Sequence, residues 1–295
     1  MDDIEQKSTL PNGRVSALLT TSRRKISLER PLVMGILNVT PDSFSDGGQL
    51  ACVENAIGRA EQLIADGADI LDVGGESTRP GGSAVDADEE LRRTLPVVAE
   101  LAKRFDVPIS VDTTKSSVAK ALIDSGAEII NDISGLRWDA RLADVAAETG
   151  AGLILMHSRG SFATMHSEPP VPDILAELNS SLAKSISTAK EAGVRDEQIV
   201  LDVGIGFGKT FEQNLELLSR LSETVTQFSP LPILVGTSRK SFLGKLLDGR
   251  SVDERLGGSI VSALVSIRNG ASIVRVHDVR QTVDAIKVSR EIGLF

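Results

Sequence analysis

Polar or ionisable side chains follow runs of aliphatic residues at eight points along this chain. Three of them, Asp112, Asn131 and Asp202, offer carboxylate or amide oxygens. Such acceptors suit a flat heterocycle that carries amino and ring N–H donors. The complete set is Asn38, Asp72 with Glu76, Asp112, Asn131, His157, Asp202, Ser238 with Arg239 and Lys240, and Arg275 with His277.

Positive charge gathers in the same segments, although the chain as a whole is acidic with a formal net charge of -9. A local basic cluster predicts an anionic ligand that is drawn to the site electrostatically. The net charge also argues against a protein that wraps nucleic acid or binds broadly to an anionic membrane. The clustered cations are Arg79, Lys209, Arg239, Lys240 and Arg275.

Each strand-end residue also has a purely local explanation, because Asp and Asn often cap the following helix or hold a turn. Asp112 tests this explanation, since Thr113, Thr114 and Ser116 follow it and can do the capping instead. Capping does not readily explain eight polar residues at the same end of their strands. We therefore expect these residues to share one site.

Three other chemistries fit the sequence less well. The segment GIGFGKT fails the phosphate-loop pattern, because the first glycine of that pattern would fall at Val203. The three histidines form no H-x-H or H-E-x-x-H pair, which argues against a zinc hydrolase. A Schiff base on Lys240 is a distant alternative, because Arg239 and the nearby acceptors fit anion or ring binding at least as well.

From Pro31 onward, short aliphatic runs alternate with longer segments of helical periodicity, which is typical of parallel strands connected through helices. Several helical segments end at glycine, as in DGADI, SGAEI, TGAGL and NGASI, where glycine provides a left-handed cap. Eight such units without a dinucleotide fingerprint predict an α/β fold, a single (β/α)8 TIM barrel. The strands are expected at 31–40, 68–75, 108–114, 128–134, 152–158, 199–205, 232–238 and 272–278.

The expected organisation is one barrel domain at residues 31–295, preceded by an N-terminal extension at 1–30 that is a flexible arm or a cover over the barrel's bottom. The length of 295 residues and the hydrophobic content of 41% suffice for such a core. Cys52 is the only cysteine, so a reducing compartment is expected. No signal peptide and no apolar run near the ~18 residues of a membrane span are present, which predicts a cytoplasmic protein.

Eight motifs between residues 32 and 279 carry a resemblance to a known family. They are GILNVTPDSFSDGG, DVGGESTRPGG, SVDTTK, NDISG, LMHSRG, GIGFGKT, GTSRKSFLG and VRVHDV. In content and order they resemble dihydropteroate synthase, a pterin-binding enzyme. The resemblance implies folate synthesis: a dihydropterin methyl group passes from its diphosphate to the amine of 4-aminobenzoate, and diphosphate is released.

The resemblance also implies a role for each matching residue. The pterin ring would be bound by Asp112, Asn131, Met156, Asp202, Phe207 and Lys240. The diphosphate would be bound by Asn38, Arg79, Arg275 and His277. The aminobenzoate pocket would be formed by Phe44, Thr78, Arg79, Pro80, Lys240 and Ser241. The catalytic residues would be Asp46, Asp112 and Lys240, and Asn38 would bind the magnesium cofactor.

The family's reaction fits this residue set, because diphosphate leaves readily once magnesium and cations neutralise its charge. Loss of diphosphate before attack by the amine requires little general-base power, so no Ser-His or Cys-His pair is needed. The family is also generally dimeric through helices late in the barrel, which implies a homodimer.

One position departs from the family pattern, which has Asp-Pro-Gly where this chain has Asp202, Val203 and Gly204. Valine restores an N–H and frees the backbone angle that proline fixes, so Asp202 can sit differently. Two related functions remain as alternatives: a pterin-binding paralogue without synthase activity, and methyl transfer from a folate to a corrinoid protein. The motifs around Phe44 and Thr78 disfavour the first, and the SRK motif disfavours the second.

Overall fold

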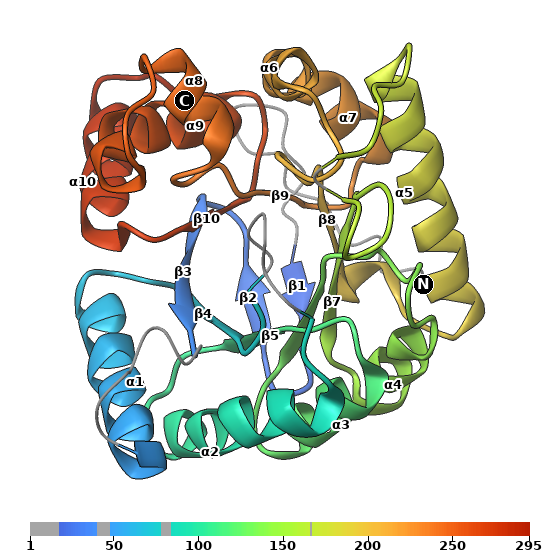
Figure 1. The fold of residues 1–295 in the computed structure, drawn as a ribbon, viewed down its shortest axis with the longest axis vertical. Coiled ribbons are helices and arrows are strands. Elements are labelled where there is room, and N and C mark those ends of the chain that lie inside the picture. The colour runs from blue at the N-terminus through green and yellow to red at the C-terminus, as the bar shows by residue number, and fades with distance from the viewer. Residues whose placement is uncertain (1–17, 40–47, 78–83, 166) are drawn as a thin grey trace, which may run out of the picture.

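The computed structural model describes residues 18–39, 48–77, 84–165 and 167–295. Eight parallel strands close into a barrel in the order β10-β3-β4-β5-β6-β7-β8-β9 (Figure 1). This confirms the predicted fold, and each expected strand is present. The strands are β3 (Leu32–Asn38), β4 (Ile70–Gly74), β5 (Ile109–Asp112), β6 (Ile129–Asp132), β7 (Gly152–Met156), β8 (Ile199–Asp202), β9 (Ile233–Val235) and β10 (Ile273–Val276).

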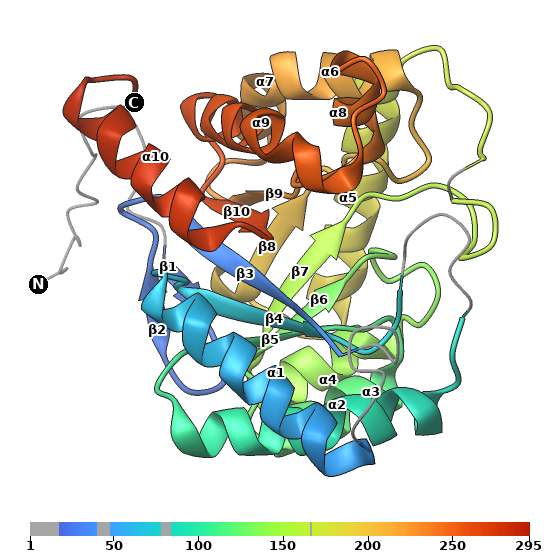
Figure 2. The same cartoon turned by 60° about the vertical axis from the view of Figure 1, so that its left-hand side comes forward.

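Helices form the outer layer around the barrel (Figures 1 and 2). They are α1 (Gly48–Ala65), α2 (Ala87–Arg104), α3 (Ser116–Asp124), α4 (Arg141–Thr149), α5 (Ile174–Glu191), α6 (Phe211–Ser219), α7 (Leu221–Phe228), α8 (Ser241–Leu246), α9 (Leu256–Arg268) and α10 (Val279–Glu291). Their inward stripes are buried as the periodicity predicts; Ala56, Ala60 and Leu63 of α1, for example, are 0% exposed. No described helix is both long enough and apolar enough to cross a membrane.

Glycines end several helices where the sequence predicts. Gly67, Gly126, Gly150 and Gly270 have φ angles of 99°, 118°, 74° and 107°. Gly126 shows the need most clearly, because a Cβ there would lie 2.4 Å from the Cβ of Ala102 on α2. A side chain at this position would therefore combine a strained backbone with a steric clash.

A small hairpin lies at the end of the barrel where the strands begin (Figure 2). It consists of β1 (Leu18–Thr20) and β2 (Lys25–Ser27), paired antiparallel. Leu19 is 0% exposed and packs with the first inward side chains of the barrel, including Met34 and Ile70. The described part of the N-terminal segment thus buries the apolar bottom of the barrel.

Candidate active site

A polar layer lies directly above the apolar bottom layer of the barrel. The bottom core includes, from alternate strands, Ile70, Ile129, Val200 and Ile273. Two residues further along the same strands stand Asp72, Asn131, Asp202 and Arg275. Side chains alternate between the two faces of a strand, so the second set also points into the barrel. Because barrel layers are built from alternate strands, these four residues form one layer.

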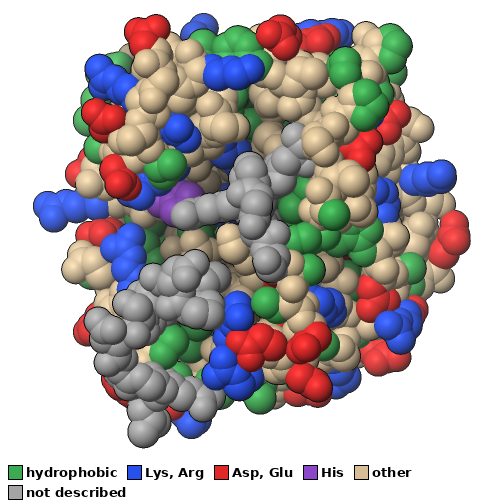
Figure 3. Space-filling view, viewed as in Figure 1, with side chains coloured by type: hydrophobic (Ala, Val, Ile, Leu, Met, Phe, Trp, Pro, Cys, Tyr) green, Lys and Arg blue, Asp and Glu red, His purple; other side chains and the backbone are tan. Residues whose placement is uncertain are grey.

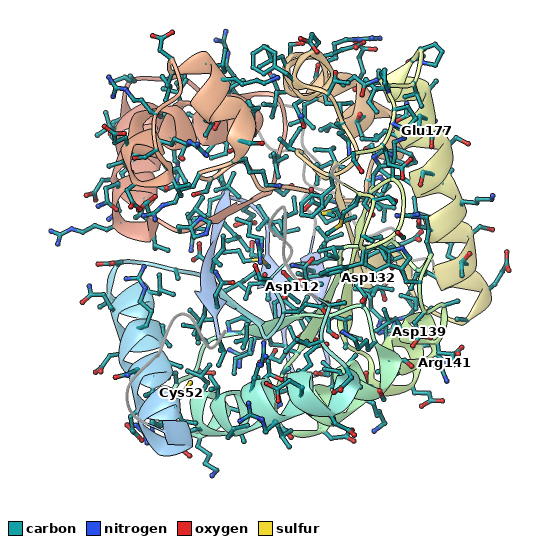
Figure 4. All side chains as sticks on the ribbon, in the orientation of Figure 1. Cys52, Asp112, Asp132, Asp139, Arg141 and Glu177 are labelled. Atoms are coloured by element: carbon teal, nitrogen blue, oxygen red, sulfur yellow. The ribbon has the colours of Figure 1, made fainter. Side chains whose placement is uncertain are left out.

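Asp112 is the last residue of β5, and Met156 is the last residue of β7. These two strands lie on either side of β6. Figure 4 shows Asp112 near the middle of the barrel, whereas Asp139 and Arg141 lie near the outer helices. Met156 is 3% exposed and pairs in register with Asp202. The structure therefore brings the predicted pterin-binding residues of three strands into one region.

Arg275 is the centre of the hydrogen-bond network at this end of the barrel. Its Nε donates to Oδ2 of Asp72 at 2.6 Å, and its Nη2 donates to Oδ2 of Asp112 at 2.9 Å. The amide Nδ2 of Asn131 donates to the same Asp72 oxygen at 3.1 Å. Strands β4, β5, β6 and β10 are thus tied together by three hydrogen bonds.

Two oxygens in this network are buried without a hydrogen-bond partner among the described residues: Oδ1 of Asp72 and Oδ1 of Asn131. Buried polar atoms in native proteins nearly always find a partner, so each exception requires an explanation. A ligand with N–H donors would satisfy such acceptors. The orphaned Asn131 oxygen therefore fits the predicted contact with an amino-bearing heterocycle.

Burial shifts the protonation of the charged groups. It raises the pKa of Asp112 above its usual range, although Arg275 opposes the shift, and it also raises the pKa of Asp202, which Lys240 opposes. Burial lowers the pKa of Lys240 to about 8, with Asp202 opposing. For Arg275, burial disfavours the charge, but Asp72 and Asp112 outweigh it and raise the pKa. Burial thus shifts the pKa values of Asp112, Asp202 and Lys240 toward neutral pH, as at many functional sites, whereas Arg275 stays charged.

The local capping explanation is wrong for Asp112, whereas Asp132, which follows Asn131, does hold a turn. The residue before α3 makes no side-chain cap, and the carboxylate of Asp112 accepts from Arg275 across the barrel. Asp132 instead accepts from the backbone amides of Ser134 and Leu136, at 2.8 and 2.5 Å. Two neighbouring polar residues on β6 thus have different roles: Asn131 faces the barrel interior, and Asp132 holds the turn.

Asp202 is held by a backbone contact that does not depend on residue 203. Its Oδ1 accepts from the amide of Gly204 at 2.8 Å. Val203 is 1% exposed within the main hydrophobic core. Within the described chain, no hydrogen bond from the Val203 amide is found. The Gly204 amide therefore fixes one oxygen of the Asp202 carboxylate, and the Val203 side chain contributes apolar packing.

Lys209 does not point toward a ligand, contrary to its expected place in the basic cluster. Its Nζ donates to three backbone carbonyls, those of His157, Gly204 and Phe207, at 3.2, 2.8 and 3.0 Å. Burial, with repulsion from Lys240, lowers the pKa of Lys209 well below its usual value. Lys209 therefore stabilises the segment after β8 through hydrogen bonds to its backbone.

The same segment contacts Lys240. The Lys240 Nζ donates to the backbone oxygen of Ile205 and lies 4.6 Å from the centre of the Phe207 ring. Ser241, the next residue, is exposed at the start of α8. The structure thus brings Lys240 close to Phe207 and within electrostatic range of Asp202, and Ser241 follows Lys240 in the chain.

The polar side chains after β9 and β10 divide into two groups. His277 is oriented by Ser238, whose Oγ lies 3.1 Å from the ring Nδ1 and accepts the His277 amide at 3.2 Å. Arg239 turns away and pairs with Asp278 at 2.6 Å and Asp253 at 3.3 Å, so its expected place among the ligand-facing cations is wrong. Figure 3 shows Lys and Arg side chains beside a histidine near the centre of this face.

The described residues at this end offer a metal ion individual oxygen ligands rather than a cluster of ligands. No group of three His, Cys, Asp or Glu residues able to hold a metal occurs among the described residues. His157 is 1% exposed, and burial lowers its pKa to about 2, so its ring is neutral. Asn38 ends β3, with its Oδ1 facing Gly74 on β4. The Asn38 amide oxygen suits a magnesium ion that is held mainly by a phosphate-bearing ligand. Mg²⁺ usually takes only one or two oxygen ligands from the protein itself.

Several predicted residues lie outside the described part of the chain: Phe44, Asp46, Thr78, Arg79 and Pro80. A network next to them escaped the sequence prediction. The Lys115 Nζ lies 2.6 Å from Glu90 and 3.4 Å from Glu76, and Glu76 accepts the Val85 amide at 2.7 Å. The charge of Glu76 was visible in the sequence, but its partners Lys115 and Val85 come from two other segments.

Comparisons with known proteins identify the family of this chain. Residues 34–277 match the family described as pterin binding enzyme. The dihydropteroate synthase of Escherichia coli strain K12 is 48% identical over 264 residues, covering 89% of this chain and 92% of the relative.

Two solved structures have nearly the same fold. The Xanthomonas albilineans dihydropteroate synthase with 4-aminobenzoic acid is 40% identical, with a TM-score of 0.88 over 95% of this chain and 99% of that one. The Burkholderia cenocepacia enzyme complexed with 7,8-dihydropteroate is 42% identical, with a TM-score of 0.85 over 94% of this chain and 97% of that one.

Proposed function

The chain belongs to the pterin-binding enzyme family and, within it, to the dihydropteroate synthases, and from this we propose how its residues divide the reaction between them. The enzyme condenses 6-hydroxymethyl-7,8-dihydropterin diphosphate with 4-aminobenzoate, forming 7,8-dihydropteroate and diphosphate. The observation that supports these assigned roles is the polar layer. In it, hydrogen-bond acceptors and the Arg275 guanidinium lie together at one end of the barrel.

The pterin ring binds among the acceptors of the middle strands. Asp112, Asn131 and Asp202 accept hydrogen bonds from its amino and ring N–H groups, and Lys240 donates to a ring acceptor. The buried Asn131 oxygen without a protein partner supports this arrangement. Met156 and Phe207 pack against the ring faces.

The diphosphate binds at the ends of the first and last strands. Arg275 and His277 contact its oxygens, and Ser238 keeps the His277 ring in place. Arg79 contributes a further cation. Magnesium, with Asn38 as a protein ligand, would neutralise charge on the diphosphate and so improve it as a leaving group.

The carbon–oxygen bond to diphosphate breaks first, and the bonding electrons leave with the diphosphate. The pterin methylene then carries positive charge, which the Asp112 and Asp202 carboxylates stabilise across the ring. The 4-aminobenzoate amine attacks this carbon, and the resulting ammonium releases its proton to solvent. Phe44, Thr78, Arg79, Pro80, Lys240 and Ser241 orient the aminobenzoate, and Asp46 stabilises the developing charge.

A turnover assay tests this function. Purified protein is incubated with magnesium, the pterin diphosphate and 4-aminobenzoate, and diphosphate release and dihydropteroate are measured together. Equal amounts of both products are expected. Diphosphate release without dihydropteroate, or no turnover over a wide substrate range, would reject the proposal. Complementation of a host that lacks the synthase, without added folate-pathway products, provides the matching test in cells.

We also propose that the enzyme is a cytoplasmic homodimer that associates through α9 and α10. Of the nine large hydrophobic residues exposed in the described chain, seven follow residue 245. Val261 and Val265 on α9 are 62% and 40% exposed, and Val288 on α10 is 60% exposed. Apolar patches of this kind mark association surfaces. Sedimentation should give a dimer, and Val261→Glu should shift the protein toward monomer.

A further inference from the structure

Asp72 is the most deeply buried charged residue of the polar layer, with a side chain 0% exposed. Its Oδ2 accepts two hydrogen bonds: from Arg275 Nε at 2.6 Å and from Asn131 Nδ2 at 3.1 Å. These donors stand on β10 and β6, each two strands away from β4 in the closed barrel. One oxygen of Asp72 thus joins a residue of the diphosphate end to a residue of the pterin end.

The Nε and Nη2 atoms of the Arg275 guanidinium have different hydrogen-bond partners. Nε is held by Asp72, whereas Nη2 contacts Asp112, which is 13% exposed. The pterin and Arg275 compete for Asp112, because the proposed ring contact requires the same carboxylate. Anchorage through Nε lets the Nη side change partners while the guanidinium keeps its position and charge.

Asn131 depends on Asp72 in a similar way. An amide can present either its oxygen or its nitrogen to a ligand. Because Asp72 takes a hydrogen bond from Nδ2, the Asn131 Oδ1 is left as the acceptor and has no partner among the described residues. A carboxylate at position 72 therefore selects the amide orientation that recognises an N–H donor.

We propose that Asp72 is a positioning residue of the synthase reaction, which anchors Arg275 through Nε and orients Asn131 through Nδ2. On pterin diphosphate binding, the Nη side of Arg275 passes from Asp112 to the diphosphate while Asp72 holds the Nε side. Asp112 is thereby released to the pterin ring. The inference rests on the proposed function of this site, and it assigns Asp72 a role through the contacts of its Oδ2 with Arg275 and Asn131.

Steady-state kinetics of Asp72→Asn and Asp72→Leu test this proposal. Both variants should raise KM for the pterin diphosphate, by ~10-fold for Asn and more for Leu, because charge-assisted hydrogen bonds are lost. KM for 4-aminobenzoate should stay within about twofold, because its binding uses neither anchored group. The inhibition constant for added inorganic diphosphate should rise together with the pterin KM.

Glu128→Gln is the matched control, because Glu128 is also a buried carboxylate paired with an arginine, but at the opposite end of the barrel. It should leave both KM values unchanged. A double-mutant cycle supplies a second readout. Because Asp72 acts through Arg275, Asp72→Asn combined with Arg275→Lys should impair the pterin KM at least ~3-fold less than the product of the single effects.

Three results would overturn the proposal: a wild-type pterin KM in a folded Asp72→Asn variant, equal rises in both KM values, or multiplicative effects in the cycle. Calorimetric titration with inorganic diphosphate and with 6-hydroxymethylpterin separates this proposal from the proposed function. If wild-type protein binds both probes without turnover, the condensation fails. Weaker binding by Asp72→Asn then still supports the positioning role, and undiminished binding rejects it.

Discussion

Both ends of the barrel contain a buried carboxylate paired with an arginine. The two pairs differ in how many of the carboxylate oxygens accept hydrogen bonds. At the end where strands begin, Glu128 accepts from Arg24 Nε at 3.0 Å, from Arg24 Nη2 at 2.9 Å and from Thr21 at 2.8 Å. Both of its oxygens are used. At the end where strands finish, Asp72 leaves one oxygen without a partner among the described residues.

The surroundings of the two pairs explain this difference. Leu19 and Leu28 of the N-terminal segment join the bottom layer of the barrel, so the Glu128 pair lies beside a closed apolar core. The Asp72 pair lies beside Asn131 and Asp112, and the Asn131 Oδ1 has no hydrogen-bond partner among the described residues. The first arrangement stabilises the fold, whereas the second leaves binding capacity for a ligand, as at the catalytic end of other barrels.

The largest effect is expected for Asp112→Asn. Asparagine replaces a carboxylate oxygen with an N–H₂ that faces Arg275 and the pterin donors, so kcat/KM for the pterin diphosphate should fall ~10³-fold. Initial-rate kinetics measure this change, with a melting curve to show that the variant is folded. Activity within tenfold of wild type would contradict the role assigned to this end.

A change in pH should affect catalysis through Lys240, at the end of the barrel where the strands finish. The buried Lys240 has a pKa of about 8, so it loses its proton as pH rises past that value. Since the charged amine is needed, kcat/KM should fall about tenfold between pH 7 and 9. In Lys240→Arg the group stays charged, and the decline should move to higher pH. A decline at the same pH in this variant would exclude Lys240 as its source.

At the other end, Glu128→Gln should change stability without changing catalysis. The loss of a buried charge partner should cost about 2 kcal/mol, because Arg24 is partly exposed and can recover solvent. For a chain of this size, that corresponds to a fall of roughly 4–6 °C in Tm. Calorimetry and kinetics are measured on the same sample; a changed kcat/KM would show that the two ends are coupled.

The smallest effect is expected for Val203→Pro, which restores the family's residue beside Asp202. The Asp202 carboxylate is held by the Gly204 amide, and residue 203 contributes apolar packing. KM for the pterin diphosphate should therefore stay within about twofold of wild type. A larger change in either direction would show that the backbone at 203 controls the carboxylate.

The sequence by itself determined the barrel and the end at which its polar residues gather. Aliphatic runs, helical stripes and helix-ending glycines are local patterns, and each reflects a conformation set within a few residues. The positions of Asp112, Asn131, Asp202 and Arg275 followed from these patterns, because the end of a parallel strand can be recognised without its neighbours.

Only the tertiary structure decided which partners these residues have. Asp72 and Arg275 are 203 residues apart and meet because β10 closes the barrel beside β3. Lys209 and Arg239 belong to the basic cluster by sequence. In the structure, Lys209 donates to backbone carbonyls and Arg239 pairs with Asp278. Charge and position along the chain do not specify the direction of a flexible side chain, because that direction depends on acceptors brought close by folding.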